Sequence, residues 1–113
     1  MVAPNRRHNP RAPCAYEGKV LGPRGSLRGI VRNLSVGGFY FASKDLLPLG
    51  TNVEAELVIE AQKLLVTAEV RHHQRLNDLP GMGLKFLRVE PAILAAVAKA
   101  VEAHLALTGP LPE

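Results

Sequence analysis

Hydrophobic and polar residues alternate along the middle of the chain with a period of two, which is typical of a β-strand with one buried face. The clearest run begins at residue 53, and its apolar members are Val53, Ala55, Leu57 and Ile59. A second run follows after a turn expected at Ala61-Gln62, and its apolar members are Leu64, Val66, Ala68 and Val70. The two runs predict a long antiparallel hairpin.

Four further segments carry weaker strand patterns and are separated by turn residues. We expect strands at residues 16–21 and 27–34, joined by a five-residue turn at residues 22–26, and a strand at residues 37–42. A polar loop at residues 76–81 leads to a last strand whose inward residues are Met82, Leu84 and Phe86. Six short strands predict a small antiparallel barrel or a tightly curled sheet.

The period changes at Glu90-Pro91, where proline suits the first turn of a helix. Apolar residues then recur at helical spacing until Gly109 and Pro110 end the run, namely Ile93, Leu94, Val97, Val101 and Leu105. We expect this stripe to cover an open end of the barrel. Pairing with a second subunit, giving a homodimer, remains the alternative.

A chain of 113 residues fits one compact domain. We expect an N-terminal arm at residues 1–13, a barrel with its helix at residues 14–107 and a tail at residues 108–113. No apolar run is long enough to span a membrane, and the N-terminus has no signal-peptide core, so we expect a cytoplasmic protein without membrane insertion. The single cysteine, Cys14, reads as a small, half-buried apolar residue.

Positive charge is concentrated near the N-terminus. The net charge is +4, but residues 1–33 carry +6 and the remainder carries −2. A basic field of this kind attracts phosphates, whether they belong to a polymer or to a small molecule.

Arg7 and Arg11 stand four residues apart on either side of Pro10, which prevents a continuous helix. Guanidinium groups suit anion binding because they offer a planar fork to phosphate oxygens or to guanine, and a flat face for stacking. Arg6 adds a third such group. By itself the pattern also fits a solvated basic tail.

The second candidate motif is Asn33-x-Ser35-x-x-Gly38. Residues 33 and 35 of a strand project from the same face, so an amide and a hydroxyl would stand side by side. Gly37 and Gly38 would allow positive φ and a close approach of backbone to ligand. The plainer interpretation is a serine turn at the end of a strand.

Together, Arg-x-x-x-Arg followed by Asn-x-Ser-x-x-Gly resembles the signature of PilZ domains, bacterial receptors for cyclic di-GMP. The similarity extends through residues 28–41, the turn at residues 48–51 and residues 68–71 and 81–86, and it covers about residues 6–107. It implies a mainly β fold, a six-stranded antiparallel split barrel with a C-terminal helix. It also implies that cyclic di-GMP is a ligand and that no further cofactor is needed.

The resemblance implies roles for individual residues. Arg7 and Arg11 match the arginines that clamp guanines and phosphates, and Arg6 matches an arginine of members that take up two stacked ligands. The second motif, which reads a guanine from the barrel surface, is matched by Asn33, Ser35, Gly37 and Gly38. Asn33 stands where many members carry Asp, so the side chain keeps a hydrogen-bond acceptor but loses the negative charge of a carboxylate. Ligand binding would order the arm and present a changed surface to a downstream protein, which the sequence does not identify, in motility or biofilm control.

Other functions fit the sequence less well. No catalytic or metal-binding set is evident, because His72 and His73 are adjacent on a predicted strand and point to opposite faces; we therefore expect no enzyme. A small nucleic-acid-binding barrel would use Phe39, Tyr40 and Phe41 for stacking, but Tyr40 must face away from the two phenylalanines. A protein–protein adaptor with weak or no ligand binding remains an alternative.

Overall fold

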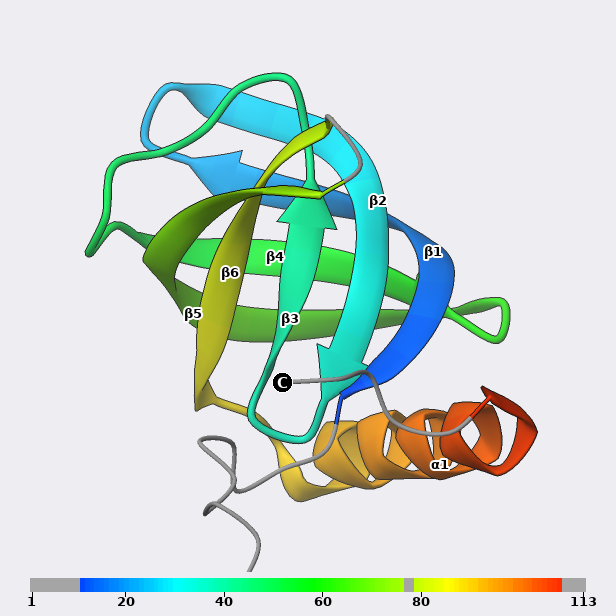
Figure 1. Ribbon diagram of the computed structural model, residues 1–113. Coiled ribbons are helices and arrows are strands. Elements are labelled where there is room, and N and C mark those ends of the chain that lie inside the picture. The colour runs from blue at the N-terminus through cyan, green and yellow to red at the C-terminus, as the bar shows by residue number, and fades with distance from the viewer. Residues whose placement is uncertain (1–10, 77–78, 109–113) are drawn as a thin grey trace, which may run out of the picture.

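The computed structural model describes residues 11–76 and 79–108. Six antiparallel strands form a closed barrel with one helix across its lower end (Figure 1). The strands are β1 (Ala12–Gly22), β2 (Gly25–Ser35), β3 (Gly38–Ala42), β4 (Asn52–Ile59), β5 (Gln62–Leu76) and β6 (Leu79–Arg88), and the helix is α1 (Pro91–Thr108). The order around the barrel is β1-β2-β3-β6-β5-β4. The predicted fold class is confirmed.

The alternation predicted for β4 and β5 is observed. Val53, Ala55, Leu57 and Ile59 of β4, and Leu64, Val66, Ala68 and Val70 of β5, all lie in the core. The hairpin pairs Ile59 with Gln62, so its two turn residues are Glu60 and Ala61. Both have positive φ, 52° and 65°, as a two-residue turn between twisted strands requires. The predicted turn position was therefore one residue late.

Three boundaries differ from the predictions because main-chain pairing extends beyond the hydrophobic pattern. The first strand begins at Ala12, which pairs with Leu34, so the end of the predicted arm at residue 13 falls inside β1. The turn between β1 and β2 has two residues instead of five, because Gly22 pairs with Gly25. The predicted polar loop at residues 76–81 is shorter, because Leu76 pairs with Leu79.

The helix closes the barrel from one end, as predicted for its apolar stripe. Val97, Ala100 and Val101 are buried in the same core as the strands, whereas Leu94 of the predicted stripe is 38% exposed. No helix in the described part of the chain, where α1 is the one helix, combines the length and the apolar character needed to cross a membrane.

A polar cluster fastens the helix to the barrel. The hydroxyl of Tyr16 on β1 donates to Oε1 of Glu60 at 2.9 Å and lies 2.7 Å from Nε2 of His104 on α1. The two rings meet edge to face at 5.5 Å. Burial, and then the hydrogen bond and charge of Glu60, raise the pKa of Tyr16 above its ordinary value. The tyrosine therefore stays neutral and connects β1, the turn between β4 and β5, and α1.

Cys14 is half-buried, and its thiol donates to the carbonyl oxygen of Val31 at 3.3 Å. Burial raises the pKa of this thiol to about 12. The thiol therefore stays protonated and unreactive at neutral pH, in keeping with a structural residue.

Candidate functional site

A cavity of about 320 Å³ opens on the outer face of the barrel where β2, β3, β5 and β6 and the residue before β1 come together. Five of the seven predicted site residues line it, namely Arg11, Asn33, Ser35, Gly37 and Gly38. The other two, Arg6 and Arg7, lie outside the described residues, as does most of the predicted arm. The structure thus brings together the described members of both sequence motifs.

The closed barrel places two rows of cross-strand neighbours at this cavity. Main-chain pairing connects Asn33, Tyr40, Gly83 and His72 across β2, β3, β6 and β5. The adjacent row connects Ser35, Gly38, Lys85 and Glu69 across the same strands. Residues up to about 50 positions apart in sequence therefore share one small surface because β6 lies between β3 and β5.

Asn33 owes its orientation to an irregularity in β2. The pairing with β3 shifts between Val31 and Asn33, which leaves Arg32 as an extra residue, and such a bulge changes where the following side chains point. Asn33 is only 3% exposed and lines the cavity. No side-chain hydrogen bond within residues 11–76 and 79–108 involves its amide. The amide is therefore available to a ligand in the cavity.

Ser35 supports the turn between β2 and β3. Its Oγ accepts hydrogen bonds from the backbone N–H of Gly37 at 3.1 Å and of Gly38 at 3.2 Å. The plainer interpretation of the motif, a serine turn, is therefore observed in a residue that also lines the cavity. The same hydroxyl donates to the Gly38 carbonyl oxygen over a long distance of 3.4 Å, so it remains able to turn toward a ligand.

Positive φ, one of the two reasons predicted for the glycines, is not observed. The glycines with positive φ in the described part of the chain are Gly25 and Gly50, and neither Gly37 nor Gly38 is among them. Gly38 is needed for space instead, because a Cβ there would overlap the carbonyl oxygen of Leu84 on the neighbouring β6. The main chains of β3 and β6 can therefore lie close together beside the cavity.

The sequence interpretation missed three polar side chains at this cavity: Arg71, His72 and Lys85. A second bulge explains why both Arg71 and His72 line the cavity. The pairing of β5 with β6 shifts between Val70 and His72, which leaves Arg71 as an extra residue. Arg71 and His72 can then both face outward. A strict period of two would have separated them, so no signal in the alternation identified them.

The cavity collects positive charge from distant parts of the chain. Arg11, which directly precedes β1, Arg71 on β5 and Lys85 on β6 all line it, and the Nε atom of Arg11 is buried. Arg71 also has an acidic neighbour, because Oε1 of Glu69 lies 3.5 Å from its Nη1. Cations from three distant parts of the chain favour an anionic ligand more than the N-terminal bias of the sequence alone suggested.

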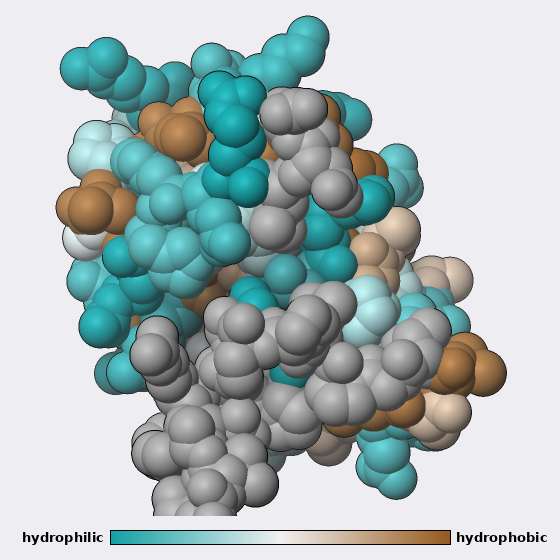
Figure 2. Space-filling view, viewed as in Figure 1, coloured by the Kyte–Doolittle hydropathy of each residue, from teal (hydrophilic) through white to brown (hydrophobic). Residues whose placement is uncertain are grey.

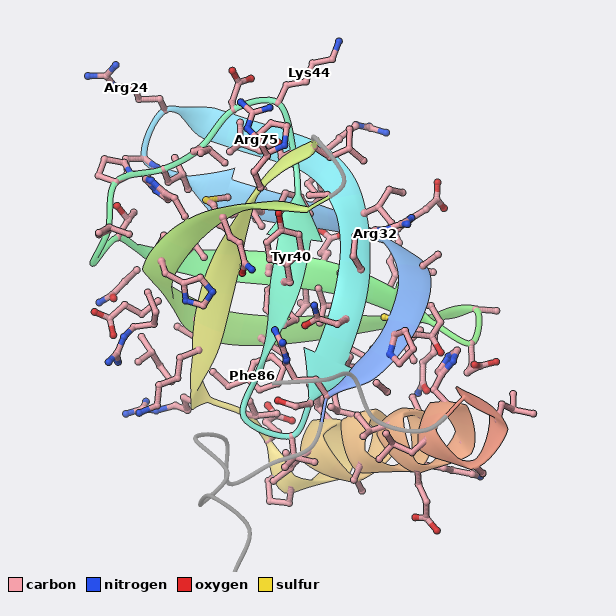
Figure 3. The ribbon with its side chains drawn as sticks, viewed as in Figure 1. Arg24, Arg32, Tyr40, Lys44, Arg75 and Phe86 are labelled. Atoms are coloured by element: carbon pink, nitrogen blue, oxygen red, sulfur yellow. The ribbon has the colours of Figure 1, made fainter. Side chains whose placement is uncertain are left out.

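The aromatic run of β3 divides between the two faces of the sheet, as predicted. Phe39 and Phe41 lie in the core, and Phe39 packs against Phe86 with ring centroids 5.6 Å apart. Tyr40 lies on the cavity side, and its hydroxyl donates to the carbonyl oxygen of Gln74 at 2.9 Å; Figure 3 shows it on β3. The three rings therefore do not form a common stacking surface for single-stranded nucleic acid.

The histidine pair is also separated. His72 lines the cavity, whereas Nε2 of His73 lies 2.6 Å from the carbonyl oxygen of Leu47. Among the residues that the structure describes, no group of three histidine, cysteine or acidic side chains is placed to hold a metal ion.

Comparisons with known proteins agree on the family and the fold. The model of the PilZ domain matches residues 5–103. The inhibitor of motility MotI/DgrA of Bacillus subtilis superposes with a TM-score of 0.81 at 16% identity, over 93% of this chain and 53% of that one. The PilZ domain of Escherichia coli YcgR with c-di-GMP superposes with a TM-score of 0.75 at 16% identity, over 91% and 94% of the two chains.

YcgR of Escherichia coli in complex with c-di-GMP gives a TM-score of 0.75 at 20% identity, over 87% of this chain and 45% of that one. The chain thus spans about half the length of the MotI chain and of this YcgR chain. No curated protein matches the sequence.

Proposed function

The chain belongs to the PilZ domain family, and on that premise we propose that it is a cytoplasmic receptor for cyclic di-GMP. The observation that carries the proposal is the cavity in which Asn33 and Ser35 meet the cations Arg11, Arg71 and Lys85. A ligand with two phosphates and two guanines needs both kinds of group, because cations neutralise the phosphates and polar groups read the base edges.

In this proposal Asn33 and Ser35 hydrogen-bond one guanine. The amide of Asn33 can donate and accept at the same time, so it suits a base edge that presents both kinds of group. Because the amide is uncharged, it gives up the charge assistance that an aspartate would supply. We therefore expect a receptor of micromolar affinity.

Arg7 and Arg11 would clamp the phosphates and stack on the guanines, with Arg71 and Lys85 adding charge from the barrel. The cavity volume of about 320 Å³ is at the small end of small-molecule sites, which span roughly 300–1,000 Å³. We therefore expect the barrel to hold one part of the dinucleotide and residues 1–10 to cover the rest. Ordering those residues would cost part of the binding free energy and create a new surface for a downstream protein.

Isothermal titration calorimetry with cyclic di-GMP tests the proposal. We expect micromolar binding that Arg11→Ala abolishes and that Asn33→Ala weakens by roughly tenfold, as for one or two lost ligand hydrogen bonds. Asn52→Ala and Arg24→Ala are matched controls, because both residues are exposed and neither lines the cavity. Absence of heat from the unmodified protein, or equal losses in the controls, would contradict the receptor function.

The stoichiometry is a separate part of the proposal. If Arg6 helps to hold a stacked pair, the fitted ratio should approach two ligands per chain and fall toward one in Arg6→Ala. A ratio of one in both proteins would refute the stacked pair and leave the receptor function standing. We propose no catalytic step, and we expect the response, in motility or biofilm control, to pass through a partner protein.

A further inference from the structure

A second hollow of about 270 Å³ lies on the outer face of β2, β3 and the start of β6. Its apolar part is formed by Ile30, Ala42, Leu79 and Pro80, and its rim carries Arg28, Arg32 and Lys44. We refer to these seven residues as the basic groove. None of them lines the cavity described above.

The apolar part of the basic groove is open to solvent. Ile30 is 36% exposed and Leu79 is 51% exposed, and small Ala42 is the cross-strand neighbour of Ile30. Figure 2 shows a mainly hydrophilic surface on the upper part of the molecule, interrupted by brown hydrophobic patches. The strands that form the groove, β2, β3 and β6, each have a neighbouring strand on both sides, so the groove is not at an open edge to which a partner could add a strand. A partner at the groove would therefore bind through side chains.

The charges of the basic groove have one sign. Three of its lining residues are cationic, and no acidic residue lines it in the described part of the chain. Arg75 lies beside the groove, because it is the cross-strand neighbour of Pro80. Figure 3 shows Arg24, Lys44 and Arg75 at the end of the barrel far from α1, with Arg32 lower on β2.

Acidic residues lie next to the basic groove without entering it. Glu17 is the cross-strand neighbour of Ile30, and with Glu56 it lines a neighbouring depression that shares Arg28 and Ile30 with the groove. Asp45 follows Lys44 in the chain, and Asp78, which precedes Leu79, lies outside the described residues. Among the described residues no acid lines the groove itself, so Arg28, Arg32 and Lys44 give its rim a net positive charge around an exposed aliphatic pair. Charge complementarity thus selects an acidic occupant, and the aliphatic pair selects one that carries an apolar side chain.

The basic groove lies next to the candidate ligand cavity. Tyr40 lines the cavity and Ala42, two residues further along β3, lines the groove, so both side chains lie on one face of the strand. The Tyr40 hydroxyl also lies 3.5 Å from the carbonyl oxygen of Leu79. A segment docked in the groove would therefore lie beside any ligand in the cavity.

We propose that the basic groove is a docking surface for an acidic segment of a partner protein that inserts an apolar side chain between Ile30 and Leu79. The segment binds by charge at the rim and by apolar burial in the centre. The proposal depends on the geometry of the groove and stands whether or not cyclic di-GMP binds.

Fluorescence anisotropy with a defined probe tests this surface. The probe is a fluorescein-labelled peptide of about a dozen residues, mainly glutamate with two central leucines. We expect saturable binding that weakens by roughly tenfold in the double variant Arg32→Glu, Lys44→Glu, because reversed rim charges repel an acidic partner. Leu79→Ser should also weaken binding, with little change in its salt dependence.

The double variant Arg88→Glu, Lys99→Glu is the matched control, because it makes the same change in net charge at exposed positions outside the groove. No binding of the peptide, or equal weakening in both double variants, would overturn the proposal. Tighter binding of a single-stranded oligonucleotide than of the peptide, lost in the groove variant, would assign the groove to nucleic acid instead. Calorimetry with cyclic di-GMP on the same proteins reports the receptor function separately.

Discussion

The substitution Gly38→Ala tests whether close approach of β3 and β6, and not backbone conformation, requires glycine beside the cavity. A Cβ at residue 38 would overlap the carbonyl oxygen of Leu84 and lie 3.1 Å from both the Leu84 carbonyl carbon and Cα of Lys85. Favourable contacts between carbon atoms are about 3.5–4.0 Å long. All three obstructing atoms are main chain, so no side-chain rotation relieves the overlap and the strands must separate.

The cost follows from that separation. Overpacking a filled site costs about 1–3 kcal/mol, and weakening one inter-strand hydrogen bond adds about 1 kcal/mol. We therefore expect Gly38→Ala to lower the free energy of unfolding by about 3 kcal/mol. A total stability of about 5–15 kcal/mol would leave the variant folded, with a melting temperature lower by roughly 10 °C.

Gly50 provides the matched control. Its φ is +86° and an added Cβ would meet nothing within 4 Å, so Gly50→Ala should cost about 1–2 kcal/mol through backbone conformation alone. Asparagine tolerates positive φ better than alanine. At residue 50 asparagine should therefore be the milder substitution, whereas at residue 38 the larger side chain should be the more damaging one.

Urea unfolding followed by far-ultraviolet circular dichroism measures all four variants, and unchanged m-values would show that only stability has changed. A loss below about 1 kcal/mol in Gly38→Ala would refute the steric argument. So would a milder effect of asparagine than of alanine at residue 38, because that order would indicate strained backbone.

Three further outcomes are expected. Tyr40→Phe should lower the free energy of unfolding by about 1 kcal/mol in urea melts, because the carbonyl oxygen of Gln74 loses the hydroxyl donor 2.9 Å away; an unchanged midpoint would contradict this. Ala61→Gly should stabilise by roughly 0.5–1 kcal/mol, because φ of +65° strains alanine; a destabilised variant would show that the turn is not strained. The pKa of the Cys14 thiol is about 12 in the folded protein against an ordinary value of 9.0. The thiol of the unfolded chain therefore ionises first, and the free energy of unfolding should fall as pH rises from 9.0 toward about 12. This fall should be shallower in Cys14→Ala, and an equal dependence of stability on pH in both proteins would refute a protonated native thiol.

The sequence predicted the elements well where one periodic signal was sufficient. The hairpin of β4 and β5 shows a period of two, and α1 shows apolar residues at helical spacing up to Gly109. The strand ends were less predictable, because β1 and β5 continue where main-chain pairing persists without an apolar alternation. Hydrogen bonds between strands are independent of side-chain type, so hydropathy does not report them.

The candidate site could be predicted only in part, for a different reason. Asn33, Ser35 and Gly38 lie close together in sequence, so a short motif revealed them. Arg71 and His72 line the same cavity because of a bulge in β5. A bulge changes the strand register, but no residue type in the sequence identified its position. The bulge at Arg32 has the same effect on Asn33.

Gly83 explains how a row of large side chains can form a cavity. It lies between Tyr40 and His72 in the cross-strand row, and a Cβ there would overlap the imidazole of His72 and lie 2.8 Å from its Nδ1. The imidazole therefore lies over the main chain of β6, in space that any other residue would fill. Because the obstructing atoms belong to a side chain, a Cβ at residue 83 would displace the imidazole of His72 and leave the main chain of β6 in place. The shape of the cavity therefore depends on the missing side chain at Gly83 as well as on the polar groups around it.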